Sequence, residues 1–181
     1  GAIDENIATA ALDNGTVTVT GVAEGSTVLP VTYSNSFIEY VPVTVYLTDL
    51  IVATENPAGY SYNPTDKTFL FTQPGSYMVS MAPGVEQTQT NRIIVAGGTE
   101  ADPINITLNG VNISSGICAL DIDESVQACL NLNLQEGTTN ILSSGNNYAG
   151  IQCTAGATLK INGSGALTAT GGYYGAGMGG G

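Results

Sequence analysis

The most chemically suggestive cluster in the sequence is a group of three carboxylates at Asp121, Asp123 and Glu124. Calcium takes about six to eight oxygen ligands, and carboxylates are prominent among them. A calcium loop, however, carries more glycine and a fixed spacing of its carboxylates. The cluster therefore leaves two hypotheses open, a calcium site and a polar corner between two strands.

Cationic side chains that could act in catalysis are scarce. The chain has only Lys67, Arg92 and Lys160, and it has no histidine. A polysaccharide lyase needs a cationic base beside a calcium-bound carboxylate, and an inverting hydrolase needs carboxylates paired across the scissile bond. The sequence therefore predicts a protein that is not an enzyme, with a pectate-lyase-like enzyme as the alternative.

Amide side chains in the second half of the chain favour binding instead. Amides and hydroxyls both donate to and accept from the hydroxyl groups of a sugar. The predicted ligand-binding residues are Asn109, Asn133, Gln135, Lys160 and Asn162.

Aromatic residues gather between positions 48 and 103. Tyr60, Tyr62 and Tyr77 lie near Phe69 and Phe71 in strand-like stretches. One hypothesis makes the three tyrosines a platform for sugar rings, although the absence of Trp removes the widest stacking face. The other makes the aromatics a plug for one end of the fold, because a coiled fold needs a cap.

The composition excludes several classes of partner. The formal net charge is -12, so nucleic acid is not expected to bind, because neutralising phosphates requires clustered Lys and Arg. The same charge repels an acidic polysaccharide unless a cation bridges the two. No run of about 18 apolar residues occurs, so no membrane span is expected.

The cysteines do not predict a metal site. Cys118, Cys129 and Cys153 lack the spacing of zinc ligands, and no histidine is available to complete a mixed site. They are expected to be buried apolar residues, and the alternative is one bonded pair with one thiol left over.

A repeated pattern in the second half predicts the fold. Ile106-Thr107-Leu108-Asn109-Gly110 recurs 26 residues later from Leu132, and again 27 residues later from Leu159. A second series begins at Ala119 and recurs from Gly150 and Gly177. Two interleaved series with almost one period indicate a solenoid, and no helical pattern accompanies them.

We predict an all-β chain whose second half is a right-handed, single-stranded parallel β-helix of about three to four turns. Leucine-rich repeats have a similar period, but they need a convex segment that the Gly-rich spacers do not offer. Stacked turns would align equivalent side chains. The expected inward columns are Ile106, Leu132 and Leu159, then Leu108, Leu134 and Ile161. The expected outward amide ladder is Asn109, Gln135 and Asn162.

The second half also resembles the secreted carbohydrate-binding β-helix domains of clostridial and gut bacterial surface proteins. The stretches that carry the resemblance are 105–113, 149–152, 156–165, 167–172 and 175–181. The resemblance implies a secreted or cell-surface protein that binds a polysaccharide or host glycan, including acidic plant pectin with the help of calcium. It also implies further turns beyond the last one, so that the exposed end would permit self-association. A purely structural stalk is the competing hypothesis.

The first segment has a different pattern. Residues 7–10 and 15–27, with 43–47 as a last strand, resemble the later half of a bacterial immunoglobulin-like domain of group 2. Such domains are usually spacers on surface proteins. The expected organisation is therefore a partial Ig-like β-sandwich over 1–47, a linker or β cap over 48–103, and a parallel β-helix over 104–181 that is truncated at its C-terminus.

Overall fold

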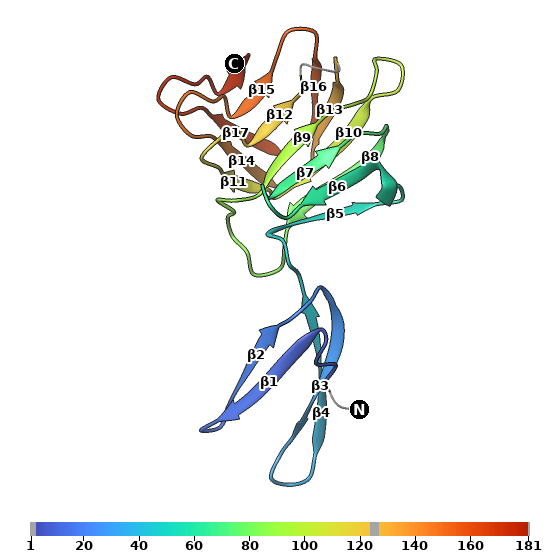
Figure 1. Ribbon diagram of the computed structural model, residues 1–181, viewed down its shortest axis with the longest axis vertical. Coiled ribbons are helices and arrows are strands. Elements are labelled where there is room, and N and C mark those ends of the chain that lie inside the picture. Colours follow the sequence, from blue (N-terminus) through green and yellow to red (C-terminus); the bar gives the residue numbers. More distant parts are fainter. Residues whose placement is uncertain (1–2, 124–126, 181) are drawn as a thin grey trace. The chain divides into compact units, whose positions relative to one another are not determined.

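The computed structural model describes residues 3–123 and 127–180 (Figure 1). The chain forms two compact units, Gly1–Thr48 and Asp49–Gly181. Each unit is described below by itself.

The first unit consists of two antiparallel hairpins. Strand β1 (Ala8–Asp13) pairs with β2 (Thr16–Gly21), and β3 (Gly25–Thr32) pairs with β4 (Ile38–Val45). Asn14 and Gly15 join the first pair with φ angles of 48° and 80°. Positive φ at both turn residues is typical of the tight turns whose twist matches that of paired strands, and Asn-Gly is their preferred sequence.

The second unit is a coil built from three sheets. One sheet has five strands, in the order β16-β13-β10-β8-β5. A second has three, β11-β14-β17, and the third has six, β18-β15-β12-β9-β7-β6. The bounds are β5 Leu50–Thr54, β6 Tyr60–Asn63, β7 Thr68–Phe71, β8 Gly75–Met81, β9 Arg92–Val95, β10 Ile104–Asn109, β11 Asn112–Ser114, β12 Leu120–Ile122, β13 Cys129–Leu134, β14 Thr139–Ser143, β15 Ile151–Cys153, β16 Thr158–Gly163, β17 Ala166–Thr170 and β18 Met178–Gly179.

Successive windings visit the three sheets in turn. Strands β10, β11 and β12 form one winding, β13, β14 and β15 the next, and β16, β17 and β18 the last, and each strand pairs in parallel with its counterpart one winding on. The windings follow one another along the coil from green to red (Figure 1). The prediction of an all-β fold with a parallel solenoid of about three to four turns is confirmed, and the structure has about four.

The alignment of the windings differs in part from the prediction. The second series is correct, because Leu120 pairs with Ile151 and Ile151 with Met178. The first series, which starts at Ile106, is aligned wrongly between the last two windings, where Leu132 pairs with Ile161 rather than Leu159. A shift of two residues keeps the same side chains facing inward, so the hydrophobic pattern alone does not distinguish the two alignments.

The shift also changes the expected amide ladder. Asn162 lies beside Asn133, and not beside Gln135 as predicted. Asn133 in turn lies beside Thr107. The predicted ladder of Asn109, Gln135 and Asn162 is therefore wrong, and Asn162 belongs to a row with Thr107 and Asn133.

The segment expected as a linker or cap contributes strands to the coil. Strands β7, β8 and β9 pair in parallel with strands of the same sheets, while β5 and β6 add antiparallel strands at the ends of the five- and six-stranded sheets. Phe69, Phe71 and Tyr77 are buried there, and Tyr60 and Tyr62 pack against them. Aromatic side chains thus fill the first part of the core.

A buried asparagine links successive windings of the coil. Asn140 is fully buried, and its Oδ1 accepts a hydrogen bond from the backbone N–H of Val111 at 3.0 Å. Its Nδ2 donates to the Ala166 carbonyl oxygen at 3.2 Å. Because Val111 and Ala166 belong to the windings before and after it, one amide links three windings and satisfies backbone groups at a buried corner.

Candidate functional site

The outward face of the five-stranded sheet carries aligned polar side chains. Along β10, Ile104, Ile106 and Leu108 are buried in the core, and the residues between them face outward. This alternation follows from the period of two along a strand. The register of β8, β10, β13 and β16 then places outward residues side by side in rows, which we call the amide face.

The first row of the amide face is joined by hydrogen bonds. Ser76, Asn105, Asn131 and Lys160 occupy equivalent positions on the four strands. Asn131 Nδ2 donates to Asn105 Oδ1 at 2.9 Å. Asn105 Nδ2 in turn donates to the Gly75 carbonyl oxygen at 3.3 Å. The amides of this row therefore have a fixed orientation.

The second row combines an apolar and a polar part. Met78, Thr107, Asn133 and Asn162 occupy equivalent positions. Met78 is partly exposed beside a shallow hollow of about 430 Å³. The hollow is lined by Ala53, Thr54, Glu55, Ser76, Tyr77, Met78 and Thr107. An apolar patch flanked by hydroxyl and amide groups matches the mixed surface of a sugar ring.

The remaining predicted residues lie at one edge of the amide face. Asn109 ends β10, and its Nδ2 lies 3.9 Å from Met78 Sδ. Gln135 follows β13 directly, and its backbone N–H donates to the Leu108 carbonyl oxygen at 3.0 Å. The structure therefore brings Asn109, Asn133, Lys160 and Asn162 onto three neighbouring strands, with Gln135 directly after the middle one. Ligand binding by these residues stays a prediction.

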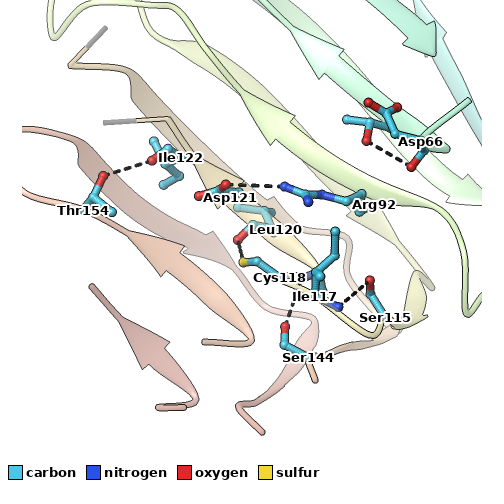
Figure 2. A network of polar contacts seen from close by, with 12 residues as sticks. Asp66, Arg92, Ser115, Ile117, Cys118, Leu120, Asp121, Ile122, Ser144 and Thr154 are labelled. Carbon is cyan, nitrogen blue, oxygen red and sulfur yellow. Dashed lines mark hydrogen bonds and ion pairs between the residues drawn. The ribbon is translucent and has the colours of Figure 1, made fainter. Parts of the chain in front are cut away.

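Asp121, one of the three predicted calcium ligands, lies on a different sheet. Asp121, on β12, faces Arg92 of β9, with Arg92 Nη2 and Asp121 Oδ2 separated by 3.4 Å (Figure 2). The backbone N–H of Asp123 donates to the Val95 carbonyl oxygen, and Glu124 lies outside the described residues. Among the described residues, no group of three His, Cys, Asp or Glu side chains is arranged to hold a metal ion. The calcium hypothesis stays a prediction, and Asp121 already has a cationic partner.

A comparison with known protein families finds a match over most of the second unit. A family model described as "Carbohydrate-binding domain-containing protein" matches residues 65–179. The chain belongs to this family. No curated protein and no solved structure shows a significant match. The part that matches the carbohydrate-binding domain family runs from β7 to β18, and so it includes the amide face.

One of the three tyrosines considered for an aromatic platform, Tyr77, is not available to a ligand. The Tyr77 side chain is only 1% exposed, and its hydroxyl donates to the Gln73 carbonyl oxygen at 2.8 Å. Burial also raises the pKa of this hydroxyl. Tyr60 stacks on Phe71, with ring centroids 5.6 Å apart, and Tyr62 lies against Phe69 at 4.7 Å. Both tyrosine rings thus pack against the aromatic part of the core while staying partly exposed, and sugar binding by Tyr60 and Tyr62 stays a prediction.

Arg92 is a charged residue of the carbohydrate-binding domain that the sequence prediction missed. The expected organisation places Arg92 outside the repeat, yet Ile93 of β9 pairs with Leu120 of β12. The signal in the sequence was weak, because Ile94 stands where β12 has the polar Asp121. The ion pair with Asp121 follows from this alignment.

The cysteines of the domain are free thiols. Cys118 and Cys129 are buried, and Cys153 is partly buried. Cys118 lies beside the Arg92–Asp121 pair, where its thiol donates to the Leu120 carbonyl oxygen at 2.9 Å (Figure 2). Burial, with a smaller contribution from the charge of Asp121, raises the pKa of Cys118 to about 11. The thiol is therefore protonated and unreactive at neutral pH.

Among the residues that the structure describes, no helix has the length and apolar character needed to cross a membrane.

Proposed function

We propose that the amide face binds a polysaccharide chain. The observation that carries the proposal is the register of β10, β13 and β16, which aligns Thr107, Asn133 and Asn162 in one row. Neighbouring strands are about 4.8 Å apart, so the row offers donors and acceptors at regular intervals. Side-chain amides supply both kinds of group, as sugar hydroxyls require.

The fixed orientation of Asn105 and Asn131 supports the same proposal. Their hydrogen bond holds two amides on the first row before any ligand arrives. Preorganised groups lose less entropy on binding, so each contact contributes more to the affinity. The shallow hollow beside Met78 extends this surface toward β5 and gives a sugar ring an apolar contact.

The proposed role is that of a non-catalytic module on a secreted or cell-surface bacterial protein, in polysaccharide binding or adhesion. The family match supports the carbohydrate ligand. The first unit would then act as an Ig-like spacer, supported by its two hairpins. Among the described strands, β16, β17 and β18 lie at the ends of their sheets, which supports self-association through that end of the coil.

The proposed ligand class includes acidic pectin only if calcium assists. The net charge of -12 repels polygalacturonate, and a divalent cation would remove that repulsion. Asp121 and Asp123 are the described carboxylates proposed to take part. Since Arg92 pairs with Asp121, calcium would have to compete with this ion pair.

The test is binding of the purified chain to soluble polysaccharides in affinity gel electrophoresis and calorimetry, with calcium or with EDTA. Pectin, polygalacturonate, xylan and β-glucan form the panel. We expect Asn133→Ala with Asn162→Ala to weaken binding about tenfold or more, because each lost hydrogen bond contributes about 1 kcal/mol. The matched control is Thr168→Ala with Thr170→Ala, which changes exposed residues of β17 on another sheet.

Three results would contradict the proposed role. If no polysaccharide of the panel binds, the stalk hypothesis is favoured instead. If both double variants bind as tightly as the unchanged protein, the amide face is not the binding site. Release of reducing ends or unsaturated products from pectin would show that the protein is an enzyme after all.

A further inference from the structure

Three tyrosines are exposed at one corner of the coil, away from the amide face. Tyr173 and Tyr174 lie in the loop between β17 and β18 and are 81% and 80% exposed. Tyr148 lies in the loop between β14 and β15, one winding earlier, and is 38% exposed. Exposing large aromatic side chains leaves apolar surface in water, and clustered surface of this kind usually marks a contact site.

The two loops are stacked closely on each other. The backbone N–H of Gly172 donates to the Tyr148 carbonyl oxygen at 3.2 Å, and that of Tyr173 donates to Asn146 Oδ1 at 3.3 Å. A Cβ atom on Gly172 would overlap the Gly145 carbonyl oxygen, and one on Gly175 would overlap that of Tyr148. Glycine at these positions therefore permits the close approach that fixes the loop carrying Tyr173 and Tyr174.

The two exposed rings form a right-angled corner. Their centroids are 4.6 Å apart, and their planes are inclined at 89°. In this arrangement one ring can lie against the apolar face of a sugar while the other borders its edge. The exposed amides of Asn146 and Asn147, on the neighbouring loop, supply donors and acceptors for hydroxyl groups.

The charge around this corner indicates the class of sugar. Residues 115–120, 142–152 and 167–180 contain no Asp, Glu, Lys or Arg. The corner thus offers no cation to an acidic sugar, and the net charge of the chain is -12. Both facts favour an uncharged ligand.

From these observations we propose that Tyr173 and Tyr174, with the amides of Asn146 and Asn147, bind a pyranose ring of a neutral polysaccharide. This inference rests on the proposed polysaccharide-binding function and adds a second binding surface to it. The amide face lies on the five-stranded sheet, whereas the tyrosine corner joins the three- and six-stranded sheets. Two separated surfaces on one coil would increase the overall affinity for a long chain.

The experiment compares four versions of the full chain with soluble xyloglucan, β-glucan, galactomannan and polygalacturonate. They are the unchanged protein, Tyr173→Ala with Tyr174→Ala, Tyr173→Phe with Tyr174→Phe, and the control Tyr40→Ala. Tyr40 is an exposed tyrosine of β4 in the first unit. Affinity gel electrophoresis and calorimetry measure binding, and circular dichroism with thermal unfolding checks the fold.

We expect the unchanged protein to bind at least one neutral polysaccharide and the double Ala variant to bind it at least tenfold more weakly. The double Phe variant should keep most of the affinity because it keeps both rings, and Tyr40→Ala should bind normally. Since the chain has no Trp, a change in tyrosine fluorescence on binding provides a second readout, expected to be smaller in the double Ala variant.

The outcomes separate this inference from the proposed function. If the double Ala variant is folded and binds as tightly as the unchanged protein, the tyrosine corner is overturned while the amide face is still testable through Asn133 and Asn162. Binding to polygalacturonate alone would overturn the neutral class of ligand. If no polysaccharide binds at all, both proposals are wrong.

Discussion

Asn131 Nδ2 donates to Asn105 Oδ1 at 2.9 Å, joining β13 to β10 on the outside of the coil. The two residues lie at equivalent positions of successive windings. A side-chain hydrogen bond between windings adds to the backbone pairing and fixes the orientation of both amides. The same pair thus contributes both to the stability of the coil and to the surface proposed to bind sugar.

Asn131→Ala should lower the free energy of unfolding by about 1 kcal/mol, the usual net contribution of one hydrogen bond. Asn109→Ala is the matched control. The amide of Asn109 lies 3.9 Å from a methionine sulfur, so its removal should change stability by less than about 0.5 kcal/mol. Urea unfolding followed by circular dichroism measures both. Equal losses in the two variants would show that the hydrogen bond between Asn131 and Asn105 does not stabilise the coil.

The second prediction concerns the stability contributed by the inward column of Ile106, Leu132 and Ile161. Ile106 is fully buried, so Ile106→Ala should cost about 2 to 5 kcal/mol. Ile161 lies in the same column but is 39% exposed in the last winding. Ile161→Ala should therefore cost less than about 1.5 kcal/mol. Thermal and urea unfolding compare the two, and a larger loss for Ile161 would contradict this column.

Close stacking of the corner loops predicts a difference between two glycines. A Cβ on Gly145 would overlap the carbonyl oxygen of Gly116 in the preceding winding, whereas a Cβ on Gly116 meets nothing within 4 Å. Gly145→Ala should therefore destabilise the protein by about 2 kcal/mol or more, because backbone must move. Gly116→Ala should change stability by less than about 1 kcal/mol. If Gly145→Ala is as stable as Gly116→Ala, the loops are not stacked as described.

The fold was predictable from the sequence because the hydrophobic residues that form its core recur at a regular spacing. Inward apolar residues recur about once per winding, and the pairing of Leu120 with Ile151 follows directly from that spacing. The alignment of Leu159 was not predictable in this way. Corner loops differ in length, and a shift of two residues preserves the inward and outward pattern.

The candidate site was less predictable, because it depends on which windings are adjacent. The ion pair between Arg92 and Asp121 can be predicted only if β9 is known to lie beside β12 in the coil. The chemistry of a side chain also does not reveal its burial. Tyr77 and Asn140 are both buried, although one of the two hypotheses for the aromatic cluster placed Tyr77 on a sugar-binding platform, and nothing in the sequence singled out Asn140.

The raised pKa of Cys118 makes the last prediction, on the pH dependence of stability. Its pKa is about 11 in the folded protein against an ordinary value of 9.0. Below pH 9 the thiol is protonated in both the folded and the unfolded chain, so it does not affect the pH dependence. Between about pH 9 and pH 11 the unfolded chain loses the proton while the folded chain keeps it, so stability falls as pH rises.

The loss should be on the order of 2 kcal/mol across this range, since one pKa unit corresponds to about 1.4 kcal/mol. Urea unfolding at pH 8, 10 and 11 measures the slope, and Cys118→Ala is the control. The two proteins share all their other ionisable groups, so the difference between the two slopes isolates the thiol. The thiol of the native protein should also react slowly with iodoacetamide at pH 8 and rapidly after unfolding. If both proteins lose stability equally and Cys118 is labelled rapidly in the native protein, the thiol is not buried as the structure describes.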